Sequence, residues 1–245
     1  MEEEIKKVLD EAEARRSTPS PVDLVRRWPT KGWSRAGFPP RHRNALEAAM
    51  NARGGIDSYD GGDVMPRKGT ALKRVATARD ALLSGDCLIG LIGPRGTGKT
   101  QIATELGFCL DRQQAMQDQL DNPHRESWEE GRVYQQKYYV LGHLLDLQKE
   151  TFGNKTLKHH ETPVGIAERV DLLILDEVQE VVQTDWQHTT LTRLIDVRYQ
   201  NMKRTILIGN LTVNGLSAAL GDSIYSRMTE TGIIIPCDWG SYRAK

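Results

Sequence analysis

Short apolar runs recur along the chain, and longer stretches of mixed polar and apolar residues separate them. Each run holds four or five residues, which is typical of strands that are buried on both faces. The stretches between the runs are long enough to hold a helix that crosses to the next parallel strand. We therefore predict an α/β fold, a five-stranded parallel sheet flanked by helices. The predicted strands are Leu88–Ile92, Tyr138–Leu141, Leu172–Leu175, Thr205–Ile208 and Gly232–Ile235.

Two amphipathic segments border the first predicted strand. Ala71–Leu83 spaces its apolar residues as a helix does, and a second helix is expected to run from the end of the strand to about Asp111. The polar stretch 112–131, rich in Gln and Glu, either extends that helix or forms a mobile insertion.

The N-terminal part of the chain has a different organisation. Residues 1–16 place Ile5, Val8, Leu9 and Ala12 on one narrow helical stripe, which either docks a partner or folds back onto the chain's own core. A run of Ser, Thr and Pro then predicts a linker. We expect an N-terminal amphipathic helix at 1–16, a linker and pre-core segment at 17–69, and the main α/β domain at 70–245.

Composition narrows the class of protein. The chain has 245 residues, a formal net charge of zero, 38% hydrophobic and 27% charged residues, which describes a soluble globular protein. A net charge of zero excludes a protein that coats nucleic acid through an overall basic surface, but it is compatible with a local basic patch. The acidic N-terminus does not fit a secretory signal, and no apolar run approaches the roughly 18 residues of a membrane span. We expect a cytoplasmic location, no membrane partner, and three reduced thiols at Cys87, Cys109 and Cys237.

The residues after the first predicted strand carry the strongest chemical signal, because they fit the phosphate-binding loop pattern G-x-x-x-x-G-K-[ST]. Glycines let backbone N–H groups turn toward phosphates, the lysine neutralises the β and γ oxygens, and the hydroxyl of Thr100 ligates Mg²⁺. The pattern predicts a nucleoside triphosphate site. Its residues are Gly93, Pro94, Arg95, Gly96, Thr97, Gly98, Lys99 and Thr100.

A second motif supplies the acids that such a site needs. The apolar run Val170–Leu175 ends in Asp176 and Glu177, as a Walker B strand does. Asp176 would hold the Mg²⁺ shell, and Glu177 would act as general base toward the attacking water. On its own, the run could equally be a buried strand that ends in solvated acids. The phosphate-binding loop favours the catalytic interpretation.

Residues beyond these motifs indicate the kind of nucleotide machine. Asn154-Lys155 continues Thr156-Leu157, so the guanine-specifying Asn-Lys-x-Asp is missing and GTP specificity is unsupported. A nucleotide kinase would need a set of arginines in its lid, and we identify no such set in the sequence. The fourth predicted strand ends at Asn210, whose amide would lie beside the γ-phosphate as a sensor, although an asparagine that starts a turn is the simpler alternative.

Three C-terminal sequence blocks, and the order in which they follow one another, make the chain resemble the DnaC/IstB family of AAA+ ATPases. Within that family the chain is most similar to DnaC-type helicase loaders. The upstream block Gly37–Arg41 also resembles the segment that precedes the ATPase core in those loaders, so the resemblance covers about Arg35 to Arg243. The N-terminal zinc-type cysteines of some loaders are missing, which leaves the mode of helicase contact open. The three blocks are Arg204–Thr212, Leu220–Met228 and Asp238–Arg243.

The resemblance implies ATP and Mg²⁺ as cofactors, and self-association into a ring or spiral. It matches Arg227 to the arginine finger that reaches the γ-phosphate held by a neighbouring subunit; a surface arginine is the alternative. Because only eighteen residues follow Arg227, we expect no C-terminal helical lid.

The segment between the second and third predicted strands is the candidate for DNA contact. It contains Phe152, Lys155, Lys158 and His159, which could stack a base and track phosphates; an ordinary solvated loop is an equal alternative. Adjacent His159 and His160 diverge too much to form a metal pair.

The resemblance favours an ATP-dependent loader of a replicative hexameric helicase onto single-stranded DNA. The main alternative is an IstB-type transposition helper that binds duplex DNA and recruits a transposase. A regulatory module that binds ATP without hydrolysing it is disfavoured by Glu177 and Arg227.

Overall fold

The computed structural model of the chain describes residues 36–52, 65, 67–85, 88–121, 135–180 and 184–242. The predicted helix at 1–16, the start of the linker and Cys87 lie outside these residues. Cys109 and Cys237 are buried and form no disulfide within the described part of the chain. Burial raises the pKa of Cys237 to about 12, so its thiol stays protonated.

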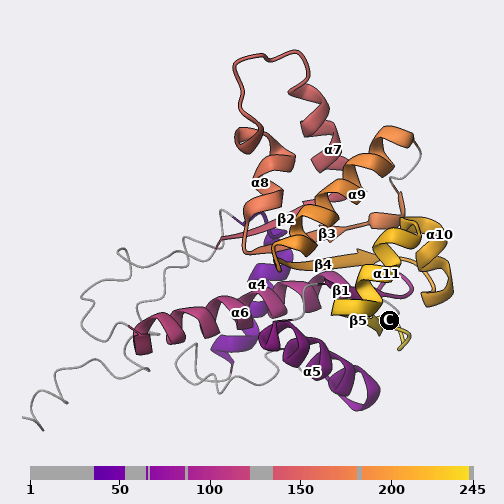
Figure 1. Cartoon of the computed structure of the whole chain (residues 1–245). Helices are drawn as coiled ribbons and strands as arrows, with labels where there is room; N and C mark the ends of the chain where they lie inside the picture. The colour runs from indigo at the N-terminus through magenta and orange to yellow at the C-terminus, as the bar shows by residue number, and fades with distance from the viewer. Residues whose placement is uncertain are drawn as a thin grey trace, which may run out of the picture.

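Five parallel strands form a single sheet, as predicted (Figure 1). The strand order is β2-β3-β4-β1-β5, and every neighbouring pair is parallel. Because β4 lies between β1 and β3, the carboxyl ends of these three strands meet at one edge of the sheet, where α/β proteins place their sites. The strands are β1 (Leu88–Ile92), β2 (Gln136–Val140), β3 (Leu172–Asp176), β4 (Arg204–Gly209) and β5 (Gly232–Pro236).

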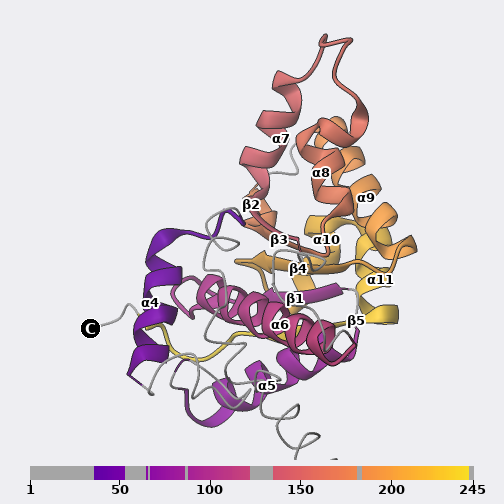
Figure 2. The same ribbon diagram turned by 90° about the vertical axis from the view of Figure 1, so that its left-hand side faces the viewer.

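Helices cover both faces of the sheet, and Figure 2 shows the two groups on opposite sides. Ile89 and Leu91 of β1 belong to the core under α5 and α6, whereas Leu88 and Ile92 belong to the core on the other face. Burial on both faces explains why the strands read as apolar runs. One group is α4 (Pro40–Asn51), α5 (Gly69–Ser84) and α6 (Lys99–Asp121); the other is α7 (Leu141–Glu150), α8 (Pro163–Arg169), α9 (Asp185–Gln200), α10 (Leu216–Leu220) and α11 (Asp222–Thr231).

The observed boundaries differ from the predicted ones by one or two residues at several ends, and two differences are informative. Leu141 begins α7 instead of ending β2, because its side chain is buried on the helix face that also carries Leu144 and Leu145. Helix α6 continues to Asp121, about ten residues beyond the predicted end. Good helix formers fill this extension, and Pro123 follows shortly after its end. The first half of the polar stretch is therefore helix, and residues 122–134 lie outside the described part.

Part of the pre-core segment packs against the α/β domain. Leu46 and Met50 of α4 form a small buried cluster with Phe108 and Cys109 of α6. Arg67 forms a buried ion pair of 2.8 Å with Glu105 of α6. These contacts fix residues 40–51 and Arg67 beside the helix that follows the phosphate-binding loop.

None of the helices in the described residues is long and apolar enough to cross a bilayer.

Candidate nucleotide site

The phosphate-binding loop joins β1 to α6, in the strand-loop-helix context that its sequence predicts. Gly98 has a φ of 84°, a conformation that L side chains rarely adopt. At Gly93 an added Cβ would lie 2.3 Å from the carbonyl oxygen of Cys237. Glycine is therefore required at Gly98 by the backbone conformation and at Gly93 by the close approach of the Cys237 carbonyl.

Lys99 lies at the start of α6 with a side chain that is almost fully buried. Its Nζ donates to the carbonyl oxygens of Gly93, at 2.8 Å, and Pro94, at 2.7 Å. The loop thus surrounds the ammonium group at the N-terminus of a long helix, where the helix dipole also favours an anion. This arrangement fits the phosphates of a nucleotide.

Thr100 and Asp176 meet at the mouth of the loop, although 76 positions separate them in the sequence. The Thr100 hydroxyl donates to Asp176 Oδ2 at 2.7 Å, and the Asp176 side chain is largely buried. A hydroxyl and a carboxylate are hard oxygen ligands of the kind that Mg²⁺ takes alongside phosphates and water. Among the described residues, no group of three or more His, Cys, Asp or Glu is arranged to hold a metal ion. Thr100 and Asp176 are the candidate Mg²⁺ ligands.

A third residue, Tyr138 of β2, also contacts Asp176. Its hydroxyl donates to Asp176 Oδ2 at 2.7 Å. Burial, followed by the charge of Asp176 and the hydrogen bond to it, raises the pKa of Tyr138 well above its ordinary value, so the phenol remains a donor. This contact was not predicted from the sequence, because it depends on the pairing of β2 with β3.

Glu177 follows β3 with a φ of 58°, in the left-handed region that is unusual for glutamate. Its backbone N–H donates to Asp176 Oδ1 at 2.8 Å, which holds the turn. Burial and the neighbouring carboxylates of Glu180 and Asp176 raise the pKa of Glu177, whereas Arg95 opposes the rise. Arg95 itself forms an ion pair with Glu180 at 2.7 Å. A raised pKa suits a group that must accept a proton.

Asn210 follows β4 directly, between the strands that carry the loop and the acids. Its backbone N–H donates to Gln179 Oε1 at 2.9 Å. The N–H of Gly93 donates to the carbonyl of Gly209 at 3.2 Å, so the end of β4 also contacts the phosphate-binding loop. The structure thus places the predicted sensor at the edge where Lys99 and Asp176 lie.

The residues after β5 brace the phosphate-binding loop from outside. Trp239 Nε1 donates to the carbonyl of Thr97 at 2.9 Å, and the backbone N–H of Tyr242 donates to the carbonyl of Gly96, also at 2.9 Å. Both lie in the block Asp238–Arg243, which carried the family resemblance but had no predicted role.

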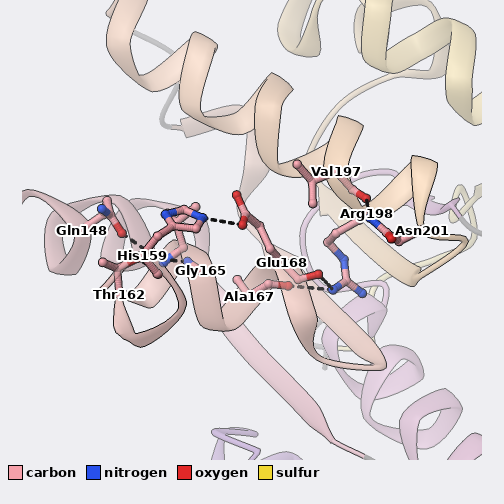
Figure 3. Close-up of polar contacts among 10 residues, drawn as sticks. Gln148, His159, Thr162, Gly165, Ala167, Glu168, Val197, Arg198 and Asn201 are labelled. Carbon is pink, nitrogen blue, oxygen red and sulfur yellow. Dashed lines mark hydrogen bonds and ion pairs between the residues drawn. The ribbon is translucent and has the colours of Figure 1, made fainter. Parts of the chain in front are cut away.

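The predicted DNA-contacting residues lie on a projection formed by α7, the loop after it, η3 (His159–Glu161) and α8 (Figures 1 and 2). Phe152, Lys155, Lys158 and His159 are all exposed. The Phe152 ring packs edge-on against Trp186 with centroids 5.5 Å apart. His159 Nε2 lies 2.6 Å from Glu168 Oε2, so this histidine faces α8 and not a metal partner (Figure 3).

The buried Arg198 of α9 fixes the base of that projection (Figure 3). Its guanidinium donates to the carbonyls of Ala167 and Val170 at 2.6 and 2.8 Å, and to Thr205 Oγ1 of β4 at 2.8 Å. The end of α8 is therefore tied to the centre of the sheet.

Comparison with known proteins supports one family. No family model matches the sequence. The replicative helicase loader DnaC of Buchnera aphidicola subsp. Baizongia pistaciae is 24% identical over 157 residues, which are 62% of this chain and 55% of that protein. The Escherichia coli K12 protein YdaV is 24% identical over 217 residues, 86% of this chain and 72% of that protein. These relatives support a DnaC/IstB-type AAA+ family at low sequence identity.

Solved structures agree on the fold. The crystal structure of DnaI has a TM-score of 0.51 at 13% identity, covering 74% of this chain and 88% of that one. The present chain spans about half the length of the Buchnera DnaC that it matches.

Arg227 lies on α11 and faces α9. Its Nη2 lies 2.9 Å from Asp196 Oδ1, and its guanidinium carbon lies 5.5 Å from the centre of the Tyr199 ring. It also donates to the carbonyl and hydroxyl of Ser223. These partners belong to α9 and α11 of the same chain.

Proposed function

We propose that this chain is an ATPase that loads a replicative hexameric helicase onto single-stranded DNA. The observation that carries the proposal is the meeting of Thr100 and Asp176 beside a buried Lys99, in a chain of the DnaC/IstB type. Similarity to helicase loaders named DnaC supports the replication role.

The residues of the site suit ATP hydrolysis. Lys99 and the loop amides would bind the phosphates, and Thr100 and Asp176 would hold Mg²⁺, which neutralises charge on the transferred phosphoryl. Glu177 would accept a proton from the water that attacks the γ-phosphorus, while the bond to the β–γ bridging oxygen breaks and ADP leaves. Asn210 would orient that water or the γ-phosphate.

Arg227 would complete the site of a neighbouring subunit. A guanidinium supplied in trans stabilises the charge that develops on the phosphoryl group. To do so, Arg227 would exchange Asp196 for the γ-phosphate across a subunit interface. ATP would then favour a ring or spiral of subunits, and hydrolysis would release it.

The projection supplies a candidate surface for single-stranded DNA. Lys155 and Lys158 would contact phosphates, Phe152 would stack a base after leaving Trp186, and His159 would add a donor. The N-terminal region would contact the helicase.

A loading assay tests this proposal. The purified chain, ATP and the replicative helicase of the source organism are incubated with closed circles of single-stranded DNA, and the helicase bound to the circles is measured. We expect transfer with ATP and none with the Lys99→Ala variant. Failure of the wild-type chain, with recruitment of a transposase to duplex DNA instead, would contradict the proposal and support the transposition alternative.

A further inference from the structure

The carboxylate of Asp176 receives three hydrogen bonds in this structure. Thr100 Oγ1 and the Tyr138 hydroxyl both donate to Oδ2 at 2.7 Å, and the Glu177 N–H donates to Oδ1 at 2.8 Å. Thr100 is itself a candidate Mg²⁺ ligand, and Glu177 belongs to the turn that carries the base. Of the three donors, only Tyr138 belongs to neither Walker motif.

Tyr138 also contacts the pre-core segment. Its backbone N–H donates to the carbonyl of Ala36 at 2.7 Å, and its ring lies 6.0 Å from the ring of Phe38. An added Cβ at Gly37 would lie 3.0 Å from the carbonyl oxygen of Tyr138. Both Ala36 and Phe38 are only 4% exposed. Residues 36–38 therefore lie tightly along β2, an edge strand of the sheet.

The same segment also contacts the start of α6, directly after the phosphate-binding loop. His42 Nδ1 lies 2.8 Å from Gln101 Oε1, and Gln101 Nε2 donates to the carbonyl of His42 at 3.1 Å. Gln101 directly follows Thr100 in the first turn of α6. Residues 36–42 thus contact the neighbours of both candidate Mg²⁺ ligands.

We propose that Tyr138 is a positioning residue that couples the pre-core segment to the Mg²⁺ side of the nucleotide site. Its hydroxyl fixes the orientation of the Asp176 carboxylate, and its ring and backbone are fixed in turn by Phe38 and Ala36. A displacement of residues 36–38, such as one caused by partner contact, is transmitted through Tyr138 to Asp176. The inference rests on the proposed Mg²⁺–ATP site and adds a means of regulating it.

The test separates Mg²⁺ affinity from nucleotide affinity. Binding of a fluorescent ATP analogue is measured in EDTA and then as Mg²⁺ is added, for the wild type and Tyr138→Phe. Loss of the hydroxyl should raise, by about tenfold, the Mg²⁺ concentration that gives half of the maximal Mg²⁺ effect on analogue binding. This size is expected for a group that orients a metal ligand. Affinity in EDTA should stay within about twofold, because the phosphate-binding loop is unchanged.

Tyr139→Phe is the matched control, because Tyr139 packs against the core on the opposite face of the sheet. It should leave the Mg²⁺ dependence unchanged. Phe38→Leu keeps the Tyr138 hydroxyl but loosens its ring, and it should raise the Mg²⁺ requirement by a smaller factor.

Identical Mg²⁺ curves for wild type and Tyr138→Phe would overturn the positioning role. A shift in Tyr138→Phe without one in Phe38→Leu would overturn the coupling to the pre-core segment. If the wild type bound no nucleotide at any Mg²⁺ concentration, the proposed function itself would fail.

Discussion

At the scale of single residues, the candidate site depends on a few side chains that hydrogen bonds bring together. Lys99 is held by two loop carbonyls, and Thr100 is held by Asp176. A bound nucleotide would replace the lysine's carbonyl partners with charged phosphate oxygens, which form stronger hydrogen bonds. The lysine should therefore dominate nucleotide affinity.

Replacing Lys99 with alanine should weaken ATP binding about a hundredfold or more, since hydrogen bonds to charged groups are worth about 1.5–3 kcal/mol each. Isothermal titration with ATP and Mg²⁺ measures this loss. Lys73→Ala, at an exposed position of α5, is the control and should bind normally. Micromolar affinity retained by Lys99→Ala would refute the assignment of the loop.

At the scale of elements, the segment after β5 acts as a brace for the loop between β1 and α6. This segment is not part of the phosphate-binding motif. It contacts the loop through the indole of Trp239 and the backbone N–H of Tyr242. Loosening this brace should reduce the preorganisation of the loop and so its affinity for phosphates.

Trp239→Phe removes the hydrogen bond to Thr97 while keeping an aromatic ring. ATP affinity should fall about two- to tenfold, which corresponds to one net hydrogen bond of about 0.5–1.5 kcal/mol. Trp186→Phe serves as the matched control, because Trp186 packs near Phe152 and Lys149 on the projection. Equal affinities for Trp239→Phe and wild type would show that the brace does not affect binding.

The elements also show what the sequence could predict. All five strands were predicted from apolar runs, although the run in β2 misses its polar start at Gln136. The two predicted motifs lie directly after β1 and at the end of β3, because their signals are local in the sequence. Leu141 was assigned to the wrong element, since a buried leucine fits a strand end and a helix start equally well. The contacts of Tyr138, Trp239 and His42 were not predicted because their partners Asp176, Thr97 and Gln101 are distant in sequence. Only the strand order and the path of the pre-core segment bring these pairs together.

At the scale of the whole molecule, the chain brings its candidate nucleotide-site residues together, whereas Arg227 faces another part of the same chain. Arg227 is only partly exposed, and it contacts Asp196 and Tyr199 of its own chain. If it serves the site of a neighbour, activity requires an assembly in which base and finger come from different chains.

Subunit mixing tests this arrangement. Arg227→Ala and Glu177→Gln subunits should each be inactive alone, and mixtures should regain part of the ATPase activity, because some interfaces then pair an intact Glu177 with an intact Arg227. Activity is measured across mixing ratios at constant total protein. Absence of recovery at every ratio would count against a shared site.

The central claim is that this chain couples ATP hydrolysis to single-stranded DNA. Steady-state ATP hydrolysis by the purified protein, alone and with matched single-stranded or duplex DNA, tests it most directly, with Glu177→Gln as the blank. The account predicts hydrolysis above the blank that single strands stimulate selectively. Turnover equal to that of Glu177→Gln, or stimulation by duplex DNA alone, would contradict it.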